Sequence, residues 1–216
     1  PFASLKVNNI LVINKAPFLG DTLFMAREVS LNLKITALFK NASETLKISS
    51  ASITNGMLSI KVNKDNISNY DIAKKDSVAI ENSESAVSFA IEEYKLQHID
   101  FSYFDEISNM KFALDSIYHQ GKGAFSKDIL DLDTATKGII SLDIENINYL
   151  NNVNISLNAV LAIDFQNSKF TFKKNTGSIH KLPLEFDGFV QLVDENQLYD
   201  VTFKTPTSSF KNVLAL

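Results

Sequence analysis

The fold is decided by the stretch Ile155-Ser156-Leu157-Asn158-Ala159-Val160-Leu161-Ala162-Ile163. Every second residue from Ile155 to Ile163 is isoleucine, leucine or alanine, and successive side chains of a β-strand point to opposite faces. The stretch therefore predicts a strand with one continuous apolar face.

The same alternation recurs along most of the chain. Shorter ladders are Val29, Leu31, Leu33 and Ile35; Phe170 and Phe172; Leu182, Leu184 and Phe186; and Val201 and Phe203. This pattern predicts a mainly β protein built on a twisted antiparallel sheet, with the shape of a groove or an open sandwich, and with a few short helices.

Turn-forming residues separate several of these ladders. Asn55-Gly56 predicts a tight hairpin, because both residues tolerate the positive φ that such a turn requires. Lys64-Asp65-Asn66 and Asp194-Glu195-Asn196 predict further turns, whereas Asp187-Gly188 fits either a turn or a bulge in a continuing strand.

Helix signals are few and short. Residues Thr36 to Asn41 and Ser208 to Leu214 each predict a short helix, while the polar stretch from Ala73 to Ala86 predicts a mobile surface loop. Residues 1–216 fit one β-rich region, or two stacked β units divided near residues 73–86.

A weak internal repeat supports the two-unit alternative. Leu46, Ile48, Ala51 and Ile53 can be laid over Tyr94, Leu96, Ile99 and Phe101. Both copies alternate, slip by one residue and resume, which is typical of a bulged strand.

Composition narrows the functional classes. The chain has 216 residues, is 45% hydrophobic and carries a net charge of only -4, which argues against disorder and against nucleic acid as a partner. It contains no cysteine, so a disulfide framework and a thiolate metal site are both excluded. The longest uninterrupted apolar run, Ala159 to Ile163, is far shorter than the roughly 20 residues of a membrane-spanning helix.

Both ends of the chain suggest a fragment of a longer protein. The first residue is Pro1 rather than Met, and the last, Leu216, falls within an apolar stretch. We expect any anchor or targeting segment to lie outside the given residues.

Residues that commonly carry chemistry do not form a recognisable site. His98, His119 and His180 lack metal-like spacing and are expected at the surface, and Asp131 and Asp133 are expected at a solvated strand edge. Gly121-Lys122-Gly123 fits a plain turn better than a phosphate-binding loop. We therefore expect no enzyme activity, no metal and no cofactor.

The remaining feature is a set of long strands with one apolar face. An ordinary sandwich core explains it, and so does a curved sheet whose apolar face stays open to acyl chains; the 16 phenylalanines suit either. If the face is open, the candidate lipid-binding wall consists of Ile155, Leu157, Ala159, Leu161, Ile163, Phe170 and Phe172.

The order of several short motifs resembles the AsmA family of cell-envelope proteins, in the form found in Bacteroidetes-like bacteria. The motifs that carry the resemblance are Val7 to Ile10, Ala16 to Phe24, Val29 to Leu33, Ile53 to Leu58, Asn69 to Ile72, Leu182 to Leu192 and Phe203 to Phe210. Together they span nearly the whole chain, although each motif alone is weak.

The resemblance implies an N-proximal, periplasmic, β-rich portion of a longer protein that is anchored in the inner membrane by a segment outside this chain. It also implies a role in outer-membrane biogenesis through lipid transport along a repeating β-groove, with phospholipid acyl chains as ligands and other envelope proteins as partners. The alternative is a scaffold with a closed core that assists outer-membrane protein assembly. The family has no catalytic motif, so no residue role is transferred.

Overall fold

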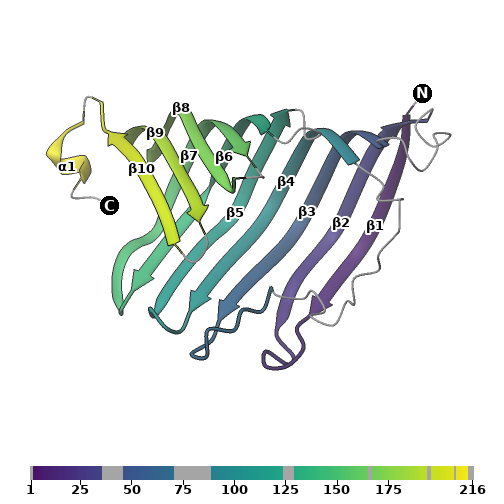
Figure 1. The fold of residues 1–216 in the computed structure, drawn as a ribbon, viewed down its shortest axis with the longest axis horizontal. Coiled ribbons are helices and arrows are strands. Elements are labelled where there is room, and N and C mark those ends of the chain that lie inside the picture. Colours follow the sequence, from purple (N-terminus) through teal and green to yellow (C-terminus); the bar gives the residue numbers. More distant parts are fainter. Residues whose placement is uncertain are drawn as a thin grey trace.

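The computed structural model describes residues 2–35, 46–70, 89–123, 129–164, 167–193, 196–206 and 208–213. Ten strands form one sheet in which neighbours follow chain order, as Figure 1 shows. The elements are β1 (Phe2–Ile13), β2 (Thr22–Lys34), β3 (Leu46–Val62), β4 (Phe89–Asp105), β5 (Met110–Gly123), β6 (Ile129–Ile144), β7 (Ile147–Asp164), β8 (Lys169–Ile179), β9 (Leu182–Val193), β10 (Asn196–Lys204) and α1 (Phe210–Val213).

The predicted β class is therefore confirmed, with one departure in topology. Neighbouring strands pair antiparallel except β3 and β4, which pair parallel and make the sheet mixed. Parallel neighbours need a long crossover connection, and residues 63–88 supply it. The predicted loop from residue 73 to residue 86 lies in this connection but outside the described residues.

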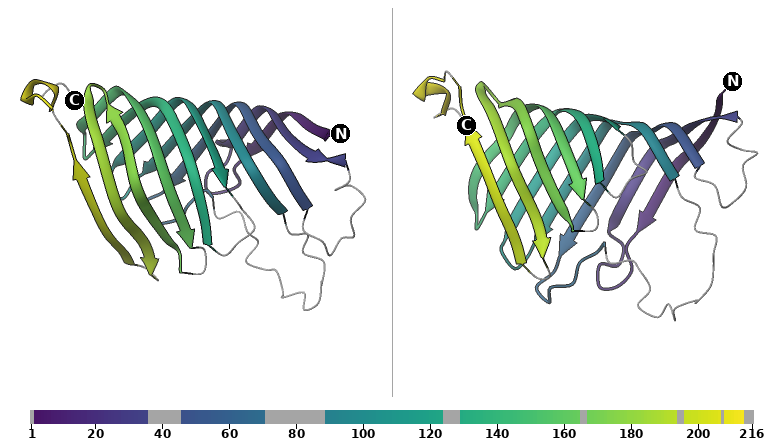
Figure 2. Two further views of the ribbon diagram at one scale, coloured as in Figure 1. Left: turned by 90° about the horizontal axis from the view of Figure 1, so that it is seen from above. Right: turned by 45° about the horizontal axis from the view of Figure 1, so that its top comes forward.

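The sheet is a single curved layer. Figure 2 shows it twisted and curled into a trough, and the extensive contacts between described strands are those between sheet neighbours. Among the described residues no second sheet faces the first, so these strands do not form a sandwich core. Among the described residues, the side chains on the concave face are therefore shielded only by the curvature of the sheet itself.

A row of residues with positive φ crosses the sheet near the middle of its first strands. Asn9 in β1, Asn55 in β3, His98 in β4 and Ser116 in β5 have φ between 50° and 55°. They lie side by side, because the nearby residues Asn8, Glu28, Thr54, Gln97 and Tyr118 are paired in register across β1 to β5. At His98 the pairing of β4 with β5 also shifts by one residue, as in a β-bulge. Each of these residues departs from the extended conformation, so an aligned row bends the sheet.

The hairpin predicted at Asn55-Gly56 is wrong. Both residues lie inside β3, where Asn55 has a φ of 51° and the strand continues beyond it. A tight hairpin also requires positive φ, which is why the dipeptide did not distinguish a turn from a positive-φ residue within a strand. A Cβ at Gly56 would stand 2.8 Å from the carbonyl oxygen of Met25, so glycine allows the close approach of β2.

The other turn and helix predictions have mixed outcomes. The turn at residues 64–66 is confirmed by a backbone hydrogen bond of 2.9 Å from Asn63 N to Ile67 O. Gly188 continues β9 with a φ of 130°, and α1 falls within the expected helix at residues 208–214. Residues 36–41 and 194–195, which hold the other predicted helix and part of the last turn, lie outside the described residues.

Both segments of the internal repeat contain a register shift, as the sequence predicts. A bulge at His98 separates Leu96 from Ile99, and the β2–β3 pairing shifts between Ile48 and Ala51. The two segments lie on the neighbouring strands β3 and β4, where the parallel pairing places Ala51 beside Tyr94.

Candidate functional site

The predicted wall lies on one face of the sheet. Strand β7 alternates regularly from Ile155 to Ile163, and its pairing with β6 places Leu161 opposite Leu132. Strand β8 adds Phe172 opposite Leu161 and Phe170 opposite Ile163. The structure therefore brings the predicted wall residues Ile155, Leu157, Ala159, Leu161, Ile163, Phe170 and Phe172 together on the same face.

These side chains differ in exposure. Ala159 is 5% exposed, while Phe170 is 36% exposed, and the remaining members of the wall are partly buried. A closed core would bury large aliphatic and aromatic side chains more completely. The wall is thus deep enough to exclude part of the solvent and remains accessible from one side.

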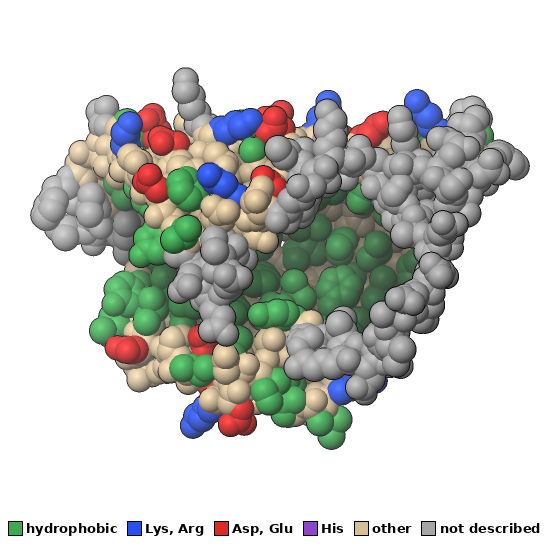
Figure 3. Space-filling model, in the orientation of Figure 1, with side chains coloured by type: hydrophobic (Ala, Val, Ile, Leu, Met, Phe, Trp, Pro, Cys, Tyr) green, Lys and Arg blue, Asp and Glu red, His purple; other side chains and the backbone are tan. Residues whose placement is uncertain are grey.

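The apolar face continues across the whole sheet. Its most buried line is Ala26, Gly56, Ile99 and Ile117, which are paired neighbours on β2 to β5 beside the row of positive-φ residues. Figure 3 shows a hollow lined by hydrophobic side chains, with charged side chains at its upper edge. We call this hollow apolar face the groove.

Aromatic side chains pack against one another inside the groove. Phe101 and Phe112 meet edge to face with ring centroids 6.1 Å apart, and Phe172 and Phe186 do so at 5.6 Å. Phe203 on the last strand follows Phe186 at 5.9 Å. These pairs hold their rings by mutual contact, without a second layer of protein above them.

A polar chain of three residues interrupts the apolar lining. Tyr94 Oη lies 2.7 Å from His119 Nε2, and His119 Nδ1 lies 2.8 Å from Thr136 Oγ1. Register places His119 on the apolar face, because it lies opposite Leu96 on β4 and two residues after Ile117. His119, expected at the surface or the rim, is half-buried on this face, and both of its ring nitrogens have partners within the sheet.

Burial shifts the acid–base properties of this chain. It lowers the pKa of His119 and raises the pKa of Tyr94, since desolvation disfavours the charged form of each group. The three residues come from different strands, and no local spacing in the sequence signals their meeting. The one local sign of these three hydrogen-bonded residues is that His119 is polar at a position where the alternating pattern of β5 calls for an apolar residue.

The remaining chemical candidates do not converge. His98 is exposed in its bulge, His180 lies in a turn, and Asp131 is paired with Lys173 at 2.7 Å on the exposed face. Gly121-Lys122-Gly123 lies within β5, so the predicted turn is wrong; a Cβ at Gly121 would stand 2.3 Å from the ring of Tyr94. The described residues contain no group of three or more side chains suited to holding a metal ion.

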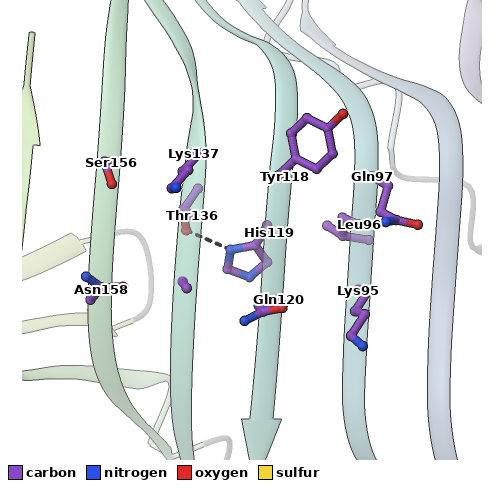
Figure 4. A pocket seen from close by; sticks show the side chains of 11 residues that line it. Lys95, Leu96, Gln97, Tyr118, His119, Gln120, Thr136, Lys137, Ser156 and Asn158 are labelled. Carbon is purple, nitrogen blue, oxygen red and sulfur yellow. Dashed lines mark hydrogen bonds between the residues drawn. The ribbon is translucent and has the colours of Figure 1, made fainter.

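A smaller hollow lies on the opposite, polar face. Figure 4 shows this pocket of about 250 Å³, whose lining includes Lys95, Gln97, Tyr118, Gln120 and Lys137. It forms around Ala135, whose small side chain leaves a gap between long polar neighbours. Its exposed side chains lie on a solvated surface, so we assign the candidate site to the groove.

The described part of the groove has the character of a binding surface. An open, partly exposed apolar surface of this length matches a flexible hydrocarbon chain better than a compact polar ligand. Among the described residues, no helix is long and apolar enough to cross a bilayer. No known protein family, curated protein or solved structure matches the chain.

Proposed function

We propose that the protein is a non-enzymatic lipid-handling module that holds acyl chains in its groove. The observation that carries this proposal is the apolar face of the single sheet, which no second layer covers among the described residues. In a monomeric soluble protein an exposed apolar surface of this extent is typical of a binding site.

The energy of apolar contact would hold an acyl chain in the groove and still let it move along the sheet. Burying one methylene group is worth about 0.8 kcal/mol, so a chain that contacts several strands is held without any one deep pocket. Because the wall repeats along the sheet with little polar interruption outside Tyr94, His119 and Thr136, an acyl chain can move between equivalent positions. The groove itself requires no energy source for such movement.

We further propose, from the resemblance of the sequence to the AsmA family, that this activity belongs to the bacterial cell envelope, at the periplasmic face of the inner membrane. Phospholipid passing between the inner and outer membranes is then the proposed cargo. Anchoring would depend on a segment outside the present chain, and other envelope proteins would be partners at either end of the sheet.

The test is native mass spectrometry with lipid extraction on protein directed to the bacterial periplasm. We expect co-purifying phospholipid in the parent protein and its loss in Leu161→Asp, because the new carboxylate would stand in the wall opposite Leu132 and Phe172. The matched control is Val160→Asp, which places the same charge on the other face of β7, beside Asp133.

Both variants are compared by circular dichroism so that lipid loss is scored only in folded protein. Equal lipid content in the two folded variants would reject the groove. If Leu161→Asp does not fold, Phe170→Ser supplies a milder change at the 36% exposed position of the wall.

A second function is favoured by the two edges of the sheet. Among the described strands, β1 and β10 each pair on one side only, and a free edge is a template for strand addition by a partner. A lipid-free, folded protein would shift the proposal to a scaffold that assists outer-membrane protein assembly.

A further inference from the structure

Exposed apolar side chains recur at one end of the strands, on the loops after β1, β3 and β4 and at the start of β7. This set, which we call the apolar rim, is Leu19 (80% exposed), Ile67 (44%), Tyr70 (56%), Ile107 (58%), Ile147 (57%) and Tyr149 (54%). The ends of β1, β3, β4 and β6 form the lower edge in Figure 1, and β7 begins there after a short turn. Figure 3 shows hydrophobic side chains reaching this edge of the groove.

Direct interactions hold the rim loops in a row. Asp21 beside the first loop accepts a hydrogen bond of 2.6 Å from Lys61 on β3, and Glu106 N donates to Val62 O at 2.9 Å. The next hairpin continues the row, since Glu145 N donates to Asn109 O at 3.1 Å. The apolar tips are therefore presented by connected loops and form one edge.

The spacing of the tips favours a fluid surface over a protein partner. The row runs from the end of β1 to the start of β7, and six strand spacings of about 4.8 Å make it roughly 30 Å long. A protein interface would need a contiguous, closely packed patch, whereas single aliphatic tips with accompanying tyrosines suit insertion between lipid head groups.

The charges of the rim segments indicate which kind of lipid surface they would bind. Residues 14–21, 63–70, 106–109 and 145–149 contain two lysines and four carboxylates, so the rim has no basic cluster for anionic lipids. Docking would depend on apolar contact and would not need electrostatic attraction.

The geometry points to a membrane-docking edge: the apolar rim inserts shallowly into the head-group region of a neutral bilayer and places the lower lip of the groove against it. This inference goes beyond the proposed lipid-holding function. It adds a route by which an acyl chain would enter sideways over the rim.

The experiment uses the absence of tryptophan from the chain. Leu19→Trp and Ile107→Trp each introduce a single fluorophore on the rim, and Tyr118→Trp introduces one at a 43% exposed position on the polar face. With phosphatidylcholine vesicles, we expect a blue shift and quenching by brominated acyl chains for the two rim proteins only. The same emission change at Tyr118→Trp, or none at either rim position, would overturn the inference.

A binding measurement provides the second readout. Leu19→Ser with Ile107→Ser should lower co-sedimentation with phosphatidylcholine vesicles about tenfold or more, since two large apolar tips are lost. The control is Phe2→Ser with Leu198→Ser, which removes two similarly exposed residues from the edge strands and should change little. Equal losses in both pairs, or binding that requires phosphatidylglycerol, would contradict docking through the rim.

The two proposals fail separately. Leu161→Asp, in the wall, should lose bound lipid and still dock, whereas the rim variants should lose docking and retain lipid acquired during expression. Loss of both properties in Leu161→Asp, with its fold intact, would mean that docking depends on the groove and not on the rim.

Discussion

At the scale of single residues, His119 shows how the groove accommodates a polar group. Its ring nitrogens are bonded to Tyr94 and Thr136, at 2.7 Å and 2.8 Å, so no polar atom of the imidazole faces the lining without a partner. Burial disfavours the protonated ring, which holds the pKa of His119 below its ordinary value of 6.5.

This shift predicts a pH dependence of stability. Below pH 6.5 the unfolded chain binds a proton at His119 that the folded protein does not yet bind, so the free energy of unfolding falls as the pH falls. Urea denaturation at about pH 7.5 and about pH 5.5 should show this loss in the parent protein and a smaller loss in His119→Gln. His98 and His180 remain in both proteins, so an identical loss in the two would contradict the assignment.

At the scale of elements, the strands are bent by residues that local pattern assigns to turns. Asn9, Asn55 and His98 hold equivalent places in β1, β3 and β4, where each follows an outward-facing residue and precedes a residue of the groove floor. Asparagine tolerates positive φ at low cost, and histidine less so. Because these positive-φ residues are aligned across neighbouring strands, their local bends add up to the curvature of the trough.

The positive φ of Asn55 supplies a prediction for this scale. Asn55→Val should lower the free energy of unfolding by about 1–3 kcal/mol, because a β-branched residue is strained at positive φ. Asn55→Gly should cost about 1 kcal/mol or less, since glycine adopts this conformation freely. Thr54→Val is the matched control at the adjacent position, and urea denaturation that ranked it with Asn55→Val would argue against a positive φ at Asn55.

At the scale of the whole molecule, the apolar side chains are shielded from water by the curvature of one sheet, where a sandwich would shield them with a second sheet. The inner strands partly bury their apolar side chains against sheet neighbours, whereas the edge strands β1 and β10 leave large apolar side chains such as Phe2 (66%) and Phe203 (64%) exposed. The polar face, in contrast, carries exposed ion pairs such as Lys6–Glu28 at 3.1 Å, which contribute little to stability.

An open groove predicts that an environment-sensitive apolar dye binds to the native protein. Dye fluorescence should rise without denaturant, while circular dichroism stays unchanged, and oleate should displace the dye because both occupy the same apolar surface. A dye signal that appears only in the urea unfolding transition would indicate a closed core. Lipid-stripped protein is the appropriate starting material, since bound phospholipid would block the site.

The sequence by itself determined the β class and the predicted wall. Alternation between Ile155 and Ile163 is a local property, because the two-residue period of a strand places these side chains on one face whatever the neighbours are. Phe170 and Phe172 follow for the same reason, once a short connection returns the chain beside β7.

Only the tertiary structure decided how the strands combine. The parallel pairing of β3 with β4, the place of Asn55 within a continuing strand and the contact of Tyr94 with His119 all depend on which residues lie opposite each other on different strands. The local preference for positive φ is the same within a strand and in a hairpin, and it does not distinguish a parallel from an antiparallel neighbour, so pairing between distant segments makes the choice. The pairing also aligns the positive-φ residues of neighbouring strands, and the sheet curves where they align.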